Sequence, residues 1–252
     1  MKNIIIIIIN FMFPLLLLAG SGQQDLIATA DSAYNAENYR LAIKKYEQVL
    51  DQGYHASELY YNLGNAYFNL NDLPPAILNY ERAKALDPGD ADINFNLRIA
   101  NSMISDKIEA VPEIFYIRWW KSLRDSFNMR TWTITSIIFF IIVLLGAGFF
   151  FLSRSASIRK MAFWTGTIFL LLTAGSFSIT YSKYNILSNH LEAIVFDPTI
   201  TVKSSPNKLG KDLFVIHEGT KVYIIEEIND WANIRIANGS TGWMPLSSIK
   251  RI

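Results

Sequence analysis

The spacing of hydrophobic and polar residues changes several times along this chain of 252 residues. An apolar run opens the chain, and apolar residues then recur at helical spacing up to about residue 105. Two further uncharged runs follow, and the remainder alternates in short segments. These patterns predict a multidomain membrane protein with an all-α repeat region, two transmembrane helices and a small all-β domain.

Two segments of the helical region repeat each other at a spacing of 34 residues, the length of a tetratricopeptide unit. The matching pairs are Ala30/Gly64, Tyr39/Leu73, Ala42/Ala76 and Tyr46/Tyr80. The second unit resembles the tetratricopeptide consensus at Tyr60, Leu63, Gly64, Tyr67, Ala76, Tyr80, Ala83 and Pro88. Small residues are expected where the two helices of a unit cross closely. Residues 23–105 are therefore predicted to form two repeats and a capping helix.

In such repeats the first helix of each unit lines a concave, protein-binding groove. The residues expected to line it are Asp31, Tyr34, Asn35, Tyr61, Asn62, Asn65, Phe68, Asn69 and Asn96. Asparagine both donates to and accepts from a peptide backbone. The lysines with which some tetratricopeptide domains clamp a terminal carboxylate are absent there, which favours an internal peptide or a helix as ligand. The alternative is a solvated helix face without a ligand.

The apolar runs predict the location of the protein. Residues 1–22 have the charged start, apolar middle and small-residue end of a signal peptide. Residues 132–152 and 161–182 carry no charge, and at ~1.5 Å per residue each spans the ~30 Å of a bilayer core. Residues 153–160 join them as a predicted cytoplasmic loop.

Charges near the spans give conflicting signals on orientation. The loop carries three cations, which favours a cytoplasmic position, but the region just before the first span carries four. Because the predicted export signal places the amino-terminal domain outside, we expect a bacterial inner-membrane protein. Both its N- and C-terminal domains are then periplasmic.

Residues 106–131 are predicted to form a linker and an amphipathic interfacial helix. Phe115, Trp119, Leu123 and Phe127 recur every four residues, and cations occupy the other face. A helix that leads directly into a membrane span most simply lies in the headgroup plane. The alternative is an additional helix packed on the repeats.

Residues 190–252 consist of short alternating runs that predict five or six strands, separated by turn residues that include the Asn238-Gly239 hairpin pair. Their order resembles the bacterial SH3 domain at Ser205-Pro206, Glu218-Gly219-Thr220, Asp230-Trp231 and Gly242-Trp243. The resemblance implies an SH3-like barrel. Because that family is often associated with cell-wall peptides, it also implies a ligand surface at Tyr223, Trp231 and Trp243. The alternative is that these aromatic residues only pack the barrel.

Motifs for catalysis are missing from the sequence. His55, His190 and His217 have no ligand-spaced partner, and there is no phosphate loop or nucleophile elbow. The chain has no cysteine, which excludes disulfides and thiolate chemistry. No basic face adjoins an aromatic platform in any soluble part of the chain, which argues against nucleic-acid binding. We expect a protein that is not an enzyme and has no cofactor or metal.

The order of all segments resembles the BatE-like family of the Bacteroides aerotolerance operon. That resemblance implies a scaffold that assembles an envelope complex linked to aerotolerance or stress, with von Willebrand A-type membrane proteins as partners. Two functions stay open from the residues. One is a membrane-anchored scaffold for envelope proteins, and the other is a cell-wall (peptidoglycan) ligand binder or sensor that acts through the SH3-like domain.

Overall fold

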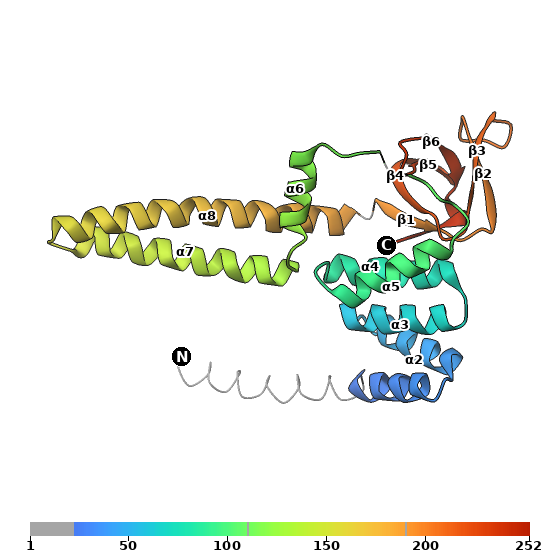
Figure 1. The fold of residues 1–252 in the computed structure, drawn as a ribbon, viewed down its shortest axis with the longest axis horizontal. Coiled ribbons are helices and arrows are strands. Elements are labelled where there is room, and N and C mark those ends of the chain that lie inside the picture. Colours follow the sequence, from blue (N-terminus) through green and yellow to red (C-terminus); the bar gives the residue numbers. More distant parts are fainter. Residues whose placement is uncertain (1–22, 110, 190) are drawn as a thin grey trace, which may run out of the picture.

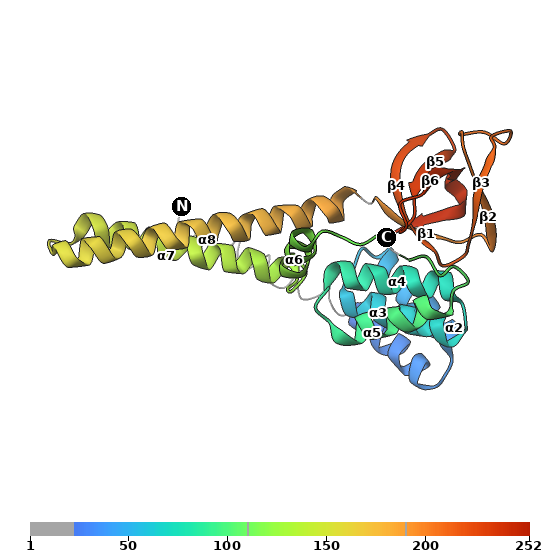
Figure 2. The same cartoon turned by 45° about the horizontal axis from the view of Figure 1, so that its top comes forward.

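The computed structural model describes residues 23–109, 111–189 and 191–252. The predicted signal peptide and His190 lie outside these residues. A stack of short helices, a long helical hairpin and a curled sheet make up the described chain (Figure 1). The hairpin projects away from the other two parts, which lie against each other in both ribbon views (Figures 1 and 2).

The repeat region is a stack of antiparallel helices. They span residues 23–35, α2 (Tyr39–Asp51), α3 (Ser57–Asn69), α4 (Leu73–Leu86) and α5 (Ala91–Met103). Polar side chains cap the amino-terminal ends of α2 and α5. Asn38 Oδ1 accepts from the Leu41 N–H, and Asp90 Oδ1 accepts from two N–H groups at the start of α5.

Gly64 marks the close helix crossing that the sequence predicts. A Cβ atom at this position would lie 2.8 Å from the Tyr80 ring and 3.3 Å from the Ala76 carbonyl oxygen. Real Cβ contacts are longer than this, so only glycine lets α3 and α4 approach so closely. The predicted reason for the small residues is confirmed.

The hairpin consists of α7 (Met129–Leu152) and α8 (Ala156–Asn189), preceded by α6 (Phe115–Arg124). Both long helices exceed the predicted spans. The link between them is shorter than the predicted 153–160, because α8 begins at Ala156. Cations do not end a helix, so Arg159 and Lys160 lie in its first turns.

Side chains in the hairpin pack closely along its length. Ser136 Oγ lies 2.8 Å from Ser176 Oγ, and the Phe139 and Phe169 rings are 5.4 Å apart. A Cβ atom at Gly146 would lie 3.5 Å from Gly166 Cα. This is an ordinary van der Waals distance, so an alanine would also fit at this contact between the two helices.

The surface of the hairpin is apolar over a length that matches a bilayer. The mean hydropathy is 2.7 for Met129–Leu152 and 1.5 for Ala156–Ile186, and only 11% and 17% of the respective apolar windows are buried. A core helix of a soluble protein would be mostly buried. By length and composition, both helices can cross a membrane.

The carboxyl-terminal part is one antiparallel sheet of seven strands. They are β1 (Glu192–Val195), β2 (Thr199–Lys203), β3 (Asp212–His217), β4 (Lys221–Ile228), β5 (Trp231–Arg235), β6 (Thr241–Pro245) and β7 (Ile249–Arg251). Their order is β3-β2-β6-β5-β4-β1-β7. All seven contribute buried side chains to one core, so the sheet is curled. The alternating runs predicted the first six strands. β7 has no alternating signal in the sequence, because it is three residues long and has two cations.

The repeat region and the sheet share a hydrophobic core. Ile194 of β1 is fully buried with Ile77 of α4 and Ala100 of α5. Ile108, in the segment after α5, packs against the core of the sheet. Residues far upstream of the hairpin therefore complete the carboxyl-terminal domain.

Candidate protein-binding site

Each repeat contains the same tyrosine hydrogen bond. The Tyr46 hydroxyl donates to Asp31 Oδ1 at 2.6 Å, and the Tyr80 hydroxyl donates to Asn65 Oδ1 at 2.8 Å. These donors and acceptors are related by the 34-residue period. Burial raises the pKa of Tyr46, and the bond to Asp31 raises it further. The hydroxyl therefore remains a donor throughout the physiological range.

A polar network connects α3, α4 and α5. Asn65 Oδ1 also accepts from Asn96 Nδ2 at 3.0 Å, and the same Nδ2 lies 3.0 Å from the Tyr61 hydroxyl. Among the described residues, Asn65 Nδ2 and Asn96 Oδ1 have no hydrogen-bond partner. The network thus fixes two amides and leaves one donor and one acceptor available.

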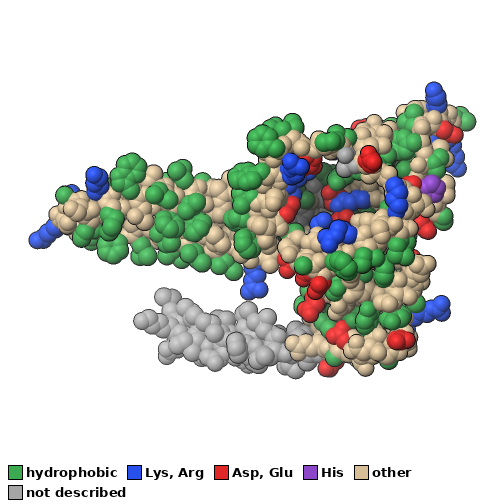
Figure 3. All heavy atoms as spheres, viewed as in Figure 1, with side chains coloured by type: hydrophobic (Ala, Val, Ile, Leu, Met, Phe, Trp, Pro, Cys, Tyr) green, Lys and Arg blue, Asp and Glu red, His purple; other side chains and the backbone are tan. Residues whose placement is uncertain are grey.

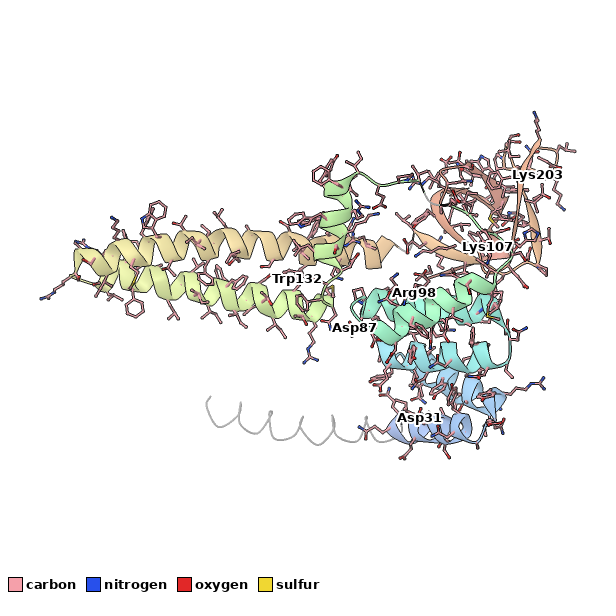
Figure 4. All side chains as sticks on the ribbon, viewed as in Figure 1. Asp31, Asp87, Arg98, Lys107, Trp132 and Lys203 are labelled. Carbon is pink, nitrogen blue, oxygen red and sulfur yellow. The ribbon has the colours of Figure 1, made fainter. Side chains whose placement is uncertain are left out.

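The other predicted groove residues fall into three groups. Asn69 Nδ2 donates to the Tyr34 hydroxyl at 3.0 Å and to the Asn65 carbonyl at 2.8 Å. Phe68, like Tyr61, is partly buried against the core around α4 and α5. Asn35 is exposed and Asn62 is half-buried, and Asp31 lies on the first described helix (Figure 4).

Residues 27–91 match the family model for the tetratricopeptide repeat. They form a tetratricopeptide repeat region. The match begins in the helix over 23–35 and ends at the first residue of α5, so the predicted repeats are confirmed. A comparison with curated proteins gives no match. Tetratricopeptide repeats in general bind other proteins, which suggests a protein-interaction scaffold.

The sheet brings the three predicted aromatic residues of the carboxyl-terminal domain onto one face. Trp243 lies opposite Asn233, Trp231 lies opposite Pro245, and Tyr223 lies opposite Arg235. Alternate positions on β4, β5 and β6 are buried, so all three residues point away from the core. Arg235 also lies 5.9 Å from the centre of the Tyr223 ring.

One feature on this outer face is unusual. Asn233 Nδ2 donates to Glu226 Oε1 at 3.2 Å, whereas the buried Asn233 Oδ1 has no partner. A buried unpaired acceptor is costly unless another group satisfies it. The aromatic surface therefore contains an amide that a ligand donor or a water molecule would stabilise.

A hollow of about 840 Å³ lies between α2, α4, the end of α8 and the carboxyl terminus. Its lining includes His55, Tyr60, Arg82 and Ile186. Burial lowers the pKa of Arg82, which donates from Nη2 to the Arg251 carbonyl at 2.7 Å. Since the lining comes from three distant parts of the chain, no sequence motif could reveal it.

Opposite charges gather near this junction. Figure 3 shows Lys, Arg, Asp and Glu side chains around a depression between α6, the sheet and the tetratricopeptide region. Its lining includes Glu81, Arg124, Asp125, Lys183 and Lys221. All five of these groups form ion pairs with one another. The depression is therefore a charged joint between domains.

His217 and His55 make side-chain contacts that no ligand spacing in the sequence indicates. His217 Nδ1 lies 2.7 Å from Asp106 Oδ1, and Asp106 Oδ2 accepts from the His217 N–H and the Thr220 hydroxyl. His55 Nδ1 lies 2.8 Å from the Tyr60 hydroxyl. Asp106 precedes His217 by 111 positions, so only the folded chain shows the pairing.

Proposed function

We propose that this protein is a non-enzymatic, membrane-anchored scaffold that binds an envelope protein through the concave face of its tetratricopeptide region. The observation that carries the proposal is the pair of fixed amides at Asn65 and Asn96. An extended peptide backbone presents alternating donors and acceptors, which the free Asn65 Nδ2 and Asn96 Oδ1 complement.

Charge adds a preference among ligands. Residues 23–92 contain 11 acidic and 5 basic residues, a difference of −6. Asp31 lies among the predicted groove residues, on the repeat next to Asn65. A segment with a net positive charge would associate faster and bind more tightly than a neutral one. We therefore expect a cationic peptide or helix as the ligand.

Membrane anchoring is part of the proposal, and the contact between the two soluble domains supports it. Lys221 of the sheet pairs with Glu81 of α4, so both domains must share one compartment. A hairpin that crosses the membrane twice meets this requirement. The predicted export signal then places both domains in the periplasm.

Cysteine labelling tests this topology, because the chain has no cysteine of its own. In spheroplasts, a membrane-impermeant maleimide should label Asn101→Cys and Lys208→Cys but not Ser155→Cys. Labelling of Ser155→Cys alone would reverse the orientation. Labelling of all three would contradict the crossing.

The resemblance to the BatE-like family specifies the proposal further. On that basis, the partners are von Willebrand A-type membrane proteins, and the complex supports aerotolerance or resistance to envelope stress. The segment order supports this assignment. Cross-linking in native membranes followed by mass spectrometry would identify the partners directly.

The substitution Asn65→Asp gives a sharp test of the groove. It keeps Oδ1 as acceptor for Tyr80 and Asn96 but removes the free donor, and Asp31 shows that the repeat fold accepts aspartate here. Relative to Asn101→Asp, which adds the same charge outside the groove, cross-linked capture should fall about tenfold, because a carboxylate oxygen replaces the amide donor and repels the ligand carbonyl. Asn101→Asp, the same change at an exposed position of α5, is the control. Equal capture by both variants would refute this binding site.

A second candidate function is cell-wall peptide binding by an SH3-like domain. The shared outer face of Tyr223, Trp231 and Trp243 around the unpaired Asn233 Oδ1 favours it. Deletion of the carboxyl-terminal domain would expose the apolar side chains of Ile77 and Ile108, which pack against it. A single substitution is therefore a better test than a deletion. Trp231→Ala should abolish sedimentation with isolated sacculi but leave protein capture unchanged. Unchanged sedimentation would remove this candidate.

A further inference from the structure

α6 exposes a continuous aromatic face. At about 100° per residue, Phe115, Tyr116, Trp119, Trp120 and Leu123 fall within about 140° of its circumference. Phe115 is 74% exposed and Trp119 is 63% exposed. No residue of α6 is buried, which disfavours the alternative of an additional helix packed on the repeats. Among the described residues, protein contacts cover part of Trp120 and Leu123, whereas Phe115, Tyr116 and Trp119 are mostly exposed.

The rest of the circumference of α6 carries cations. Arg118 and Lys121 lie about 60° and 120° from Phe115 on the other side of the helix. Lys121 pairs with Glu113, in the segment just before the helix. Cations and aromatic rings on adjoining faces match the phosphates and the upper acyl region of a phospholipid headgroup layer.

The position of α6 is continuous with the apolar hairpin. α6 lies transverse to α7 and α8 at their base, and Figure 2 shows it nearly end-on at the same place. Hydrophobic side chains gather over α6 and along the hairpin in Figure 3. If the hairpin crosses a bilayer, a transverse helix at its base lies parallel to the bilayer surface.

Specific contacts hold α6 in this orientation. Arg124 donates to both oxygens of Asp125 at 2.8 Å, and the buried Lys183 of α8 lies 3.7 Å from Asp125 Oδ1. The Trp132 indole N–H donates to the Arg124 carbonyl at 3.2 Å, and Figure 4 shows Trp132 at the base of α7. The turn between α6 and α7 is thus braced from both long helices.

We propose that α6 is a lipid-binding helix whose aromatic face inserts into the phospholipid headgroup layer. Together with the braced turn, this contact fixes the angle of the tetratricopeptide region above the bilayer. The inference rests on the proposed membrane anchoring, but it can fail separately. A scaffold on a single hinge would sample many orientations, whereas insertion of α6 adds a second attachment.

Spin labelling of the full chain in phosphatidylcholine–phosphatidylglycerol vesicles tests the inference. Nitroxides are placed singly through Trp119→Cys, Arg118→Cys and, as a control in the hairpin, Leu144→Cys. Accessibility to oxygen reports lipid exposure, and accessibility to a water-soluble nickel chelate reports exposure to water. We expect the label at 119 to favour oxygen over nickel at least about tenfold relative to the label at 118.

The outcomes separate the two proposals. If the label at 144 lies in lipid and the label at 119 is as accessible to nickel as that at 118, the lipid-binding inference fails while anchoring stands. If the label at 119 is shielded from both reagents, a protein covers α6 and the inference also fails. If the label at 144 is accessible to nickel, membrane anchoring itself is wrong.

Discussion

The Lys221 ammonium lies 2.9 Å from Glu81 Oε2, across 140 positions of sequence and the whole hairpin. Glu192 Oε2 lies 2.7 Å from the same ammonium. Burial alone would lower the pKa of Lys221, but Glu81 and Glu192 outweigh burial and raise it. The ion pair therefore persists through neutral pH and is lost only as the pH rises past the raised value.

Removal of Lys221 should loosen the docking of the sheet on the repeats. Lys221→Met leaves the buried Glu81 carboxylate without its partner, which should cost about 3 kcal/mol. Spin labels at Glu58→Cys and Lys208→Cys should show a broader distance distribution in this variant. The double variant Lys221→Met with Glu81→Leu should recover much of the loss. An unchanged distribution in Lys221→Met would show that the shared core alone holds the domains.

Low pH should weaken the hydrogen bonds that Asp106 accepts from His217 and Thr220 of the sheet domain. Burial would raise the pKa of Asp106, but hydrogen bonds from His217 and Thr220 outweigh burial and lower it. A depressed carboxyl pKa gives stability that is present above the ordinary value of about 3.9 and is lost as the pH falls through the folded value. The difference in Tm between wild type and Asp106→Asn should therefore be largest near pH 7 and should shrink toward pH 3. Glu218→Gln, an exposed change in the same turn, should show no such trend.

The two tyrosine bonds of the repeats should differ in strength. Tyr46 donates to the carboxylate of Asp31, whereas Tyr80 donates to the neutral Asn65, which also keeps its bond from Asn96. Tyr46→Phe should cost about 2 kcal/mol and Tyr80→Phe about 1 kcal/mol, because hydrogen bonds to charged groups are stronger. Thermal unfolding of the two variants in the same detergent measures the order. The reverse order would show that solvent screens Asp31.

An alanine at Gly64 should destabilise the second repeat. Its Cβ would meet the Tyr80 ring at 2.8 Å, so the cost of overpacking, about 2 kcal/mol, should exceed the gain in helix propensity of about 1 kcal/mol. Hydrogen exchange of α3 and α4 should accelerate. Gly175→Ala, at a helical glycine with nothing within 4 Å, should leave stability unchanged or slightly higher. Equal behaviour of the two variants would contradict the close crossing.

Local sequence patterns determined the elements of this protein. The 34-residue period predicted the paired helices, because a repeated unit places the same side chains at the same crossing, as Gly64 and Tyr80 show. Alternation predicted five or six strands, since successive side chains in a strand point to opposite faces of the sheet. The Asn238-Gly239 turn was also predicted, and Gly239 has the positive φ of 88° that favours glycine.

Only the tertiary structure decided which faces meet. Ile194 is part of the core of the repeats, and Ile108 packs against the core of the sheet. Asp106 forms a hydrogen bond with His217, which lies 111 positions later in the chain. The sequence shows that an apolar residue must be buried and that a charged residue needs an opposite charge if it is buried. It does not show which residue is the neighbour, because many residues could bury the first or pair with the second. The choice among them depends on the shape of the whole chain, which local spacing does not encode. For that reason the sequence determined the repeats, the apolar helices and the strands, and the folded chain decided that the repeats and the sheet form one unit above the hairpin.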